Sequence, residues 1–97
     1  MTRRAVVWDK VALRGYIDLV RGCDEKGVEQ IRECIEQHLE ALADDPSIGS
    51  VFEVRPSVYL HRFRCVDGDR GVWLQLDVER LSPEEIAVLY CGKIVVL

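Results

Sequence analysis

The fold of this chain is decided by residues 51–81, which read VFEVRPSVYLHRFRCVDGDRGVWLQLDVERL. Apolar and polar side chains alternate on both sides of Asp67-Gly68, a standard signal for a tight β-hairpin turn. One face of the first arm carries Tyr59, His61, Phe63 and Cys65, and the other carries Val58, Leu60, Arg62 and Arg64. The stretch therefore predicts two long antiparallel strands, the first with positive charge gathered on it.

The chain before this hairpin predicts a strand and a helix. Residues 5–8 are apolar and partly β-branched, as in a short buried strand. Asp9 can cap the helix that follows, because its carboxylate accepts from free amide groups of the first turn. The apolar face of this helix is expected to consist of Ala12, Leu13, Tyr16, Ile17 and Val20. Gly22 is placed to end the helix.

A second helix is predicted from Val28 to Leu42. Its expected apolar face consists of Val28, Ile31, Cys34, Ile35, His38, Leu39 and Leu42, and its opposite face of Glu29, Glu33, Glu36 and Glu40. Pro46 ends the helix, because a residue before proline is pushed out of the α region. The connection over 22–27 is short and polar, so the two helices are expected to be antiparallel neighbours.

The last segment allows two interpretations. Residues 82–85 read Ser-Pro-Glu-Glu, which is typical of a helix start. Residues 86–91 form a continuous apolar run, which is typical of a buried strand. We expect a tight turn into a strand, and a helix over 83–91 stays open as the alternative. Trp8 and Trp73 are both expected to pack in the core.

Composition limits the classes of function. The 97 residues are expected to form one domain, 1–97, with a formal net charge of −4. The charge sums to +2 over 1–27 (six basic, four acidic), −5 over 28–50 (one basic, six acidic) and −1 over 51–97 (six basic, seven acidic). An acidic chain is poorly suited to non-specific nucleic-acid binding, which depends on neutralising phosphates. Without a membrane span or signal peptide, the expected location is the cytoplasm.

The cysteines and histidines do not predict a metal site. Cys23, Cys34, Cys65 and Cys91 show no CxxC spacing, and neither histidine lies beside one of them. In a reducing compartment we expect these cysteines to be small buried apolar residues, with Cys23 the most exposed. No Gly-rich phosphate loop is present, so we expect neither a metal nor a small-molecule cofactor.

The order of predicted elements resembles the RelE/ParE superfamily of bacterial toxin–antitoxin pairs, including its HigB-like branch. The similar stretches are 6–9 with Ala12 and Leu13, 39–42 with Asp45, Pro46 and Gly49, 59–64 as an aromatic-x-x-Arg strand, and 88–93 as a closing strand. This resemblance implies an α+β fold with an N-terminal strand, an antiparallel helical hairpin and a three- to four-stranded antiparallel twisted sheet. It also implies an antitoxin partner and a target, either the ribosome with its mRNA or DNA gyrase.

The resemblance and the residues together supply candidate site residues. Arg62 matches the arginine of the family's sheet motif, and Lys93 lies where a basic residue closes the last strand. Arg64 shares a strand face with Arg62, so that the two could clamp a phosphate. The candidate catalytic residues are therefore Arg62, Arg64 and Lys93, and the candidate binding residues are Arg55, Tyr59, His61 and Tyr90.

Three functions follow from this pattern. The family's second sheet arginine would fall near Trp73-Leu74, where Leu74 is not basic, so the expected nuclease residues are largely missing. We therefore expect a toxin-fold protein that acts through binding a protein partner. The first alternative is a ribosome-dependent mRNA endonuclease. The second is a non-enzymatic α+β module that forms a homodimer through a C-terminal edge strand ending in the apolar run 94–97.

Overall fold

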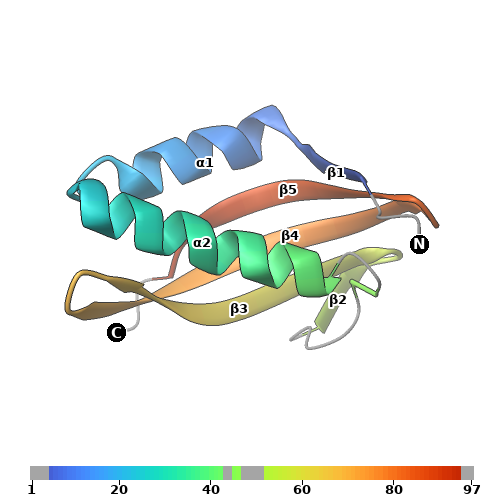
Figure 1. Ribbon diagram of the computed structural model, residues 1–97. Helices are drawn as coiled ribbons and strands as arrows, with labels where there is room; N and C mark the ends of the chain where they lie inside the picture. The colour runs from blue at the N-terminus through green and yellow to red at the C-terminus, as the bar shows by residue number, and fades with distance from the viewer. Residues whose placement is uncertain (1–4, 43–44, 47–51, 95–97) are drawn as a thin grey trace.

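The computed structural model describes residues 5–42, 45–46 and 52–94 of the chain. Its elements are β1 (Ala5–Trp8), α1 (Lys10–Val20), α2 (Glu25–Leu42), β2 (Phe52–Arg55), β3 (Val58–Asp67), β4 (Arg70–Ser82) and β5 (Glu85–Lys93). The five strands form one sheet in the order β1-β5-β4-β3-β2. Both helices lie on the same side of this sheet (Figure 1). The expected α+β architecture is therefore confirmed.

The sheet differs from the expectation at one edge. Strands β2 to β5 are antiparallel neighbours, as the sequence predicts. The N-terminal strand joins them as a fifth strand and runs parallel to β5, with Ala5 opposite Glu85 and Trp8 opposite Val88. Strand β5 is therefore the second strand of the sheet and not an edge strand over this stretch. Residues 95–97 of the predicted C-terminal edge lie outside the described residues.

Residues 83–91 contain no helix. A turn at Pro83 and Glu84 leads directly into β5, and the hydroxyl of Ser82 accepts a hydrogen bond from the Glu84 amide at 3.2 Å. The serine therefore caps a turn and not a helix. The strand interpretation of the apolar run is confirmed, because the run forms most of β5, with Ile86, Val88 and Cys91 buried.

The core lies between the helices and the facing side of β3, β4 and β5. Leu74, Leu76 and Val78 of β4 expose none of their surface. The core cluster around them consists of Ala12, Ile31, Ile35, Leu39, Leu42, Phe63, Cys65, Val72, Ile86, Val88 and Cys91. Alternation along each strand sends the intervening side chains to the sheet face that the helices do not cover. Burying an apolar side chain of this size contributes about 1.5–3 kcal/mol.

Helix α1 approaches the sheet closely at Gly15. The Asp9 carboxylate accepts from the Val11 amide at 2.9 Å, which confirms the predicted cap. A side chain added at Gly15 would collide with the carbonyl oxygen of Cys91 on β5. The glycine weakens the helix locally, but its missing Cβ lets α1 lie against the backbone of β5.

Gly15→Ala is predicted to destabilise the protein although alanine favours helices. The new methyl group has to displace the helix from β5, and overpacking of this kind costs about 1–3 kcal/mol. Gly22→Ala is the matched control, since nothing lies within 4 Å of a Cβ at Gly22. Urea denaturation should show a lower free energy of unfolding for Gly15→Ala and a change within about 0.5 kcal/mol for Gly22→Ala. Equal stabilities for the two variants would contradict the close approach.

Helix α2 begins at Glu25, three residues before the predicted start. Asp24 accepts from the Gly27 amide at 2.8 Å and so caps this end. The β3–β4 turn docks here, because the amide of Gly68 donates to the Gln30 side chain at 2.7 Å. Gly68 has a positive φ of 64°, as an Asp-Gly turn requires.

Candidate functional site

The uncovered side of the sheet is the first candidate surface, and we call it the open face. The register of β2 to β5 places eight polar or aromatic side chains there: Arg55, Arg62, Arg64, Trp73, Gln75, Asp77, Glu79 and Tyr90. Arg62 and Arg64 are both exposed on this face, as the alternation predicts. The open face therefore brings together two of the three candidate catalytic residues.

Most charges on the open face are already engaged with neighbours. Arg62 Nε lies 3.4 Å from Gln75 Oε1, and Gln75 Nε2 donates to Asp77 Oδ1 at 3.1 Å. Arg55 forms a long ion pair of 3.9 Å with Glu79. Gln75 thus connects a guanidinium to a carboxylate across β3 and β4. This arrangement is a polar network that stabilises the sheet surface weakly, since exposed ion pairs contribute at most about 1 kcal/mol.

The pair Arg64 and Trp73 is the least expected part of this face. The two residues are directly opposite in the β3–β4 register. The guanidinium of Arg64 lies over Gly71, in the space that a side chain there would occupy. Trp73 is 46% exposed, so the expectation that it packs in the core is wrong. Trp8, in contrast, is partly buried against the core cluster.

The remaining candidate residues lie apart from this pair. Lys93 is opposite Leu74, whose side chain faces the helices, so Lys93 does not share the open face with Arg62. Tyr90 is on the open face, with its ring over Gly92. Tyr59 is opposite Glu53 of β2, towards the helix side. The structure therefore does not bring the three candidate catalytic residues into one cluster.

His61 is a buried residue on the helix side. It is 3% exposed, and its Nε2–H donates to the carbonyl of Pro46 at 2.7 Å. Burial lowers the pKa of His61 from its ordinary value, and the bond to Pro46 opposes this shift. The neutral ring fits this site, while a charged one would lose its hydration. His61 therefore holds the chain after α2 against β3, and it does not reach the open face.

The protein is predicted to lose stability as the pH falls below about 6.5, the ordinary pKa of histidine. The pKa of His61 is lower in the folded state, so the unfolded chain binds the proton more tightly. Stability is complete above the unfolded pKa and declines as the pH falls towards the folded one. Between pH 7.5 and pH 5, the free energy of unfolding should fall less for His61→Gln than for the wild type. Glutamine keeps a donor for the Pro46 carbonyl. An identical decline in both proteins would contradict this role.

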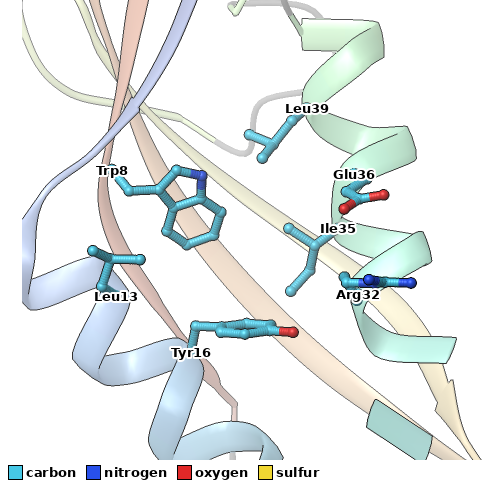
Figure 2. Close-up of a pocket in the computed structure, with 7 residues that line it drawn as sticks. All are labelled: Trp8, Leu13, Tyr16, Arg32, Ile35, Glu36 and Leu39. Carbon is cyan, nitrogen blue, oxygen red and sulfur yellow. The ribbon is translucent and has the colours of Figure 1, made fainter. Parts of the chain in front are cut away.

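The second candidate surface is a groove between the helices, which we call the helix groove. It is lined by Trp8, Leu13, Tyr16, Arg32, Ile35, Glu36 and Leu39, and its volume is about 250 Å³. Figure 2 shows Trp8 and Tyr16 facing Ile35 and Leu39 across it. Trp8 and Tyr16 contact edge to face, with ring centroids 6.1 Å apart. The groove is thus an apolar slot with aromatic walls.

The groove exists because the two helices are anchored to different strands. α1 packs chiefly on β5 and α2 on β3, and the helices hardly contact each other. The sequence predicts a helical hairpin with both apolar faces buried. Instead, Leu13 is 45% exposed and Ile17, one turn further along α1, is 53% exposed. Sequence periodicity marks these residues as apolar, but it cannot show that α2 stands away from them.

The wall that α2 contributes is acidic on its outer side. The helix carries five glutamates against one lysine and one arginine. Arg32 of the groove is paired with Glu29 at 3.2 Å. The apolar slot is therefore bordered by net negative charge along α2.

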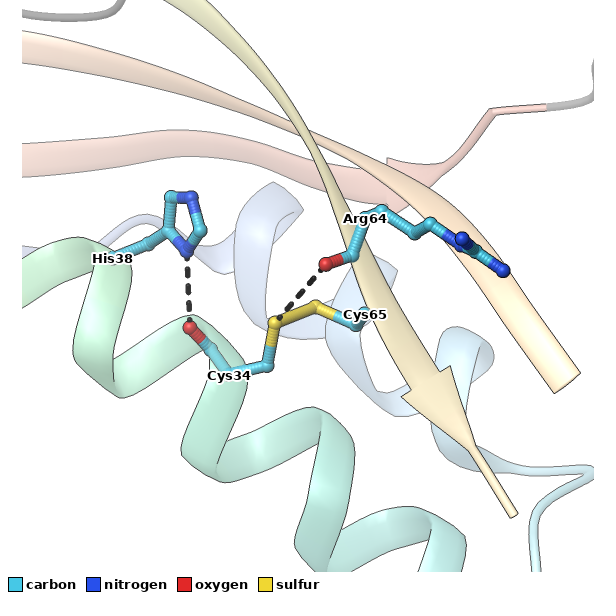
Figure 3. The surroundings of a disulfide bond; sticks show 4 residues. All are labelled: Cys34, His38, Arg64 and Cys65. Carbon is cyan, nitrogen blue, oxygen red and sulfur yellow. Dashed lines mark hydrogen bonds between the residues drawn. A yellow bond between two sulfur atoms is a disulfide. The ribbon is translucent and has the colours of Figure 1, made fainter. Parts of the chain in front are cut away.

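Two cysteines form a disulfide, which corrects the expectation that all four are free. Cys34 of α2 and Cys65 of β3 are bonded, with Cα atoms 5.9 Å apart (Figure 3). A cross-link over a separation of 31 residues contributes about 3–4 kcal/mol by restricting the unfolded chain. Beside it, His38 stacks on Phe63 with ring centroids 3.8 Å apart. Cys91 is free and fully buried, which raises the pKa of its thiol to about 11.

The described part of the chain holds no group of three or more His, Cys, Asp or Glu placed to bind a metal ion. Neither helix within the described ranges is long and apolar enough to cross a bilayer. No protein-family model matches this chain, and no curated protein matches it in sequence.

Proposed function

We propose that this chain is the toxin-fold partner of a bacterial toxin–antitoxin pair, with a RelE/ParE-like fold, and that it acts in the cytoplasm by binding proteins. The order of its elements supports the proposal, since a strand and two helices precede four antiparallel strands. The observation that carries the proposal is the helix groove, which leaves aromatic and aliphatic side chains accessible in a small domain. Slots of this kind between helices commonly accept an amphipathic helix.

The partner segment that fits the helix groove is a basic amphipathic helix. Apolar residues spaced at one helical turn would enter the slot beside Leu13, which is half exposed. Lysine or arginine on the flanks would face the glutamates of α2. Complementary charge of this sort speeds association and selects the partner more than it adds affinity. We assign this segment to an antitoxin.

The open face favours binding over RNA cleavage. Cleavage through the 2′-hydroxyl needs a base, an acid and a cation for the phosphorane charge. Arg62 and Arg64 supply cations, but His61 is buried on the other side of the sheet. Asp77 is hydrogen-bonded to Gln75, and Glu79 faces Arg55. The homodimer alternative has less support, because β5 is paired with β1 and so is not a free edge over Glu85–Val88.

A growth experiment tests the proposal and the site together. Induced expression in a bacterial host should arrest growth, and co-expression of the adjacent open reading frame should restore it. Leu13→Glu should stay toxic but escape this rescue, because a carboxylate in the slot repels the apolar partner face. We expect its affinity for the purified partner to fall at least about tenfold, by calorimetry.

Leu81→Glu is the matched control, since Leu81 is equally exposed but lies at the far end of β4. It should be rescued like the wild type. A harmless wild-type protein would contradict the toxin assignment. Full rescue of Leu13→Glu would contradict the helix groove as the binding site.

The endonuclease alternative is favoured by Arg64 and Trp73, which could hold a phosphate and stack on a base. We predict that mapping of mRNA 5′ ends after induction shows no codon-phased cuts. Cuts that disappear in Arg62→Ala but persist in Arg70→Ala would establish the nuclease instead. Arg70 is a suitable control because it is an exposed arginine at the β3–β4 turn.

A further inference from the structure

The Cys34–Cys65 disulfide lies directly behind one wall of the helix groove. Four of the seven groove residues are on α2, and Arg32, Ile35 and Glu36 are within two residues of Cys34. The bond fixes this turn of α2 to β3. The opposite wall is formed by β1, which is the edge strand beside β5, and by α1, which packs on β5. The disulfide therefore fixes one wall of the groove relative to the other.

The surroundings of the disulfide accommodate a reduced form as well. Sγ of Cys34 lies 3.7 Å from the carbonyl oxygen of Arg64, so a thiol at Cys34 would have an acceptor there (Figure 3). Helix α2 is also held by the apolar contacts of Ile31, Ile35, Leu39 and Leu42, which do not involve the bond. Opening of the bond would therefore loosen the middle of α2 without unfolding the helix layer.

The two sulfur atoms differ in access. Cys65 is 2% exposed, while Cys34 is partly exposed where α2 meets β3. An external thiolate can thus attack Sγ of Cys34, and Cys65 leaves as a thiolate that takes up a proton. A second thiolate then attacks the external sulfur of this mixed disulfide, and Cys34 leaves as a thiolate that takes up a proton, so that the two external thiols form one disulfide and both cysteines are reduced. The reverse reaction uses a low-molecular-weight disulfide as oxidant.

We propose that the Cys34–Cys65 bond is a redox switch for the helix groove, in which the oxidised protein binds its basic amphipathic partner tightly and the reduced protein binds it weakly. The inference rests on the proposed function, because it regulates the same site. A fixed α2 wall spares the partner the cost of ordering that wall on binding. In the reducing cytoplasm proposed for this chain, disulfides are usually transient and redox-sensing.

The first experiment measures a change in the helix groove on reduction, without any partner present. In a Trp73→Phe background Trp8 is the only tryptophan, and it lines the helix groove. Its fluorescence should change when dithiothreitol reduces the oxidised protein. The change should be absent in Cys34→Ser/Cys65→Ser, which cannot form the bond, and present in Cys23→Ser. Circular dichroism of the double variant should show intact helices.

The second experiment measures binding of a synthetic helix of about 18 residues with leucines at one-turn spacing and lysines on both flanks. Its dissociation constant should be about tenfold smaller for the oxidised than for the reduced protein. Cys34→Ser/Cys65→Ser should bind as the reduced protein does, with or without dithiothreitol. A peptide with glutamates in place of the lysines is the control for charge.

The outcomes separate the two proposals. Peptide binding of equal strength in both redox states overturns the switch but leaves the groove as a docking site. No change in Trp8 fluorescence on reduction also overturns the switch. No binding in either state, together with full rescue of Leu13→Glu in cells, overturns the helix groove as the docking site, whereas a harmless wild-type protein overturns the proposed function. Alkylation of all four cysteines in protein never exposed to reductant would show that the bond does not form.

Discussion

The helix-facing side of β4 excludes water completely, since Leu74, Leu76 and Val78 are fully buried. Because side chains alternate along a strand, burying this face determines which residues of β4 point outward. The neighbouring strands follow the same register, so Arg62 and Arg64 of β3 have to lie on the open face. A slip of one residue would bury two guanidiniums, which is prohibitively costly without partners. The burial of one side of β4 thus determines which side chains form the open face.

The two helices pack on the sheet at two separate places. Gly15 lets α1 lie against the backbone of β5, and the bond between Cys34 and Cys65 holds α2 on β3. Between these two contacts the helices do not close over the sheet, and the space left between them is the helix groove. The groove is small, about 250 Å³, and its walls include the rings of Trp8 and Tyr16. Ile35 and Leu39 belong both to the core cluster and to the wall of the groove.

Much of this architecture follows from local patterns. The Asp9 cap, the Asp67-Gly68 turn and the alternation of β3 and β4 depend on neighbours in the sequence, and all three were predictable. The parallel pairing of β1 with β5 was not, because it joins residues some 80 positions apart.

The site was predicted only in part. Alternation placed Arg62 and Arg64 on a common outward face, and it separated His61 from them. The disulfide was missed, because the connectivity of four cysteines cannot be read from their spacing. The helix groove was missed for a related reason: periodicity identifies Leu13 and Ile17 as apolar, but their exposure depends on where α2 lies. Trp73 was assigned to the core because tryptophan is usually buried, although the alternation along β4 already placed it on the outward face.

The separate anchoring of the helices is the central claim, and native-state amide hydrogen exchange tests it most directly. Amides of β4 from Leu74 to Val78 should exchange only through global unfolding, since they lie in the dry centre of the sheet. Amides of α1 should exchange through a local opening of lower free energy, while α2 in the oxidised protein stays protected. Exchange of α1 and α2 with one common free energy would show that the helices form a single packed hairpin, and it would contradict this account.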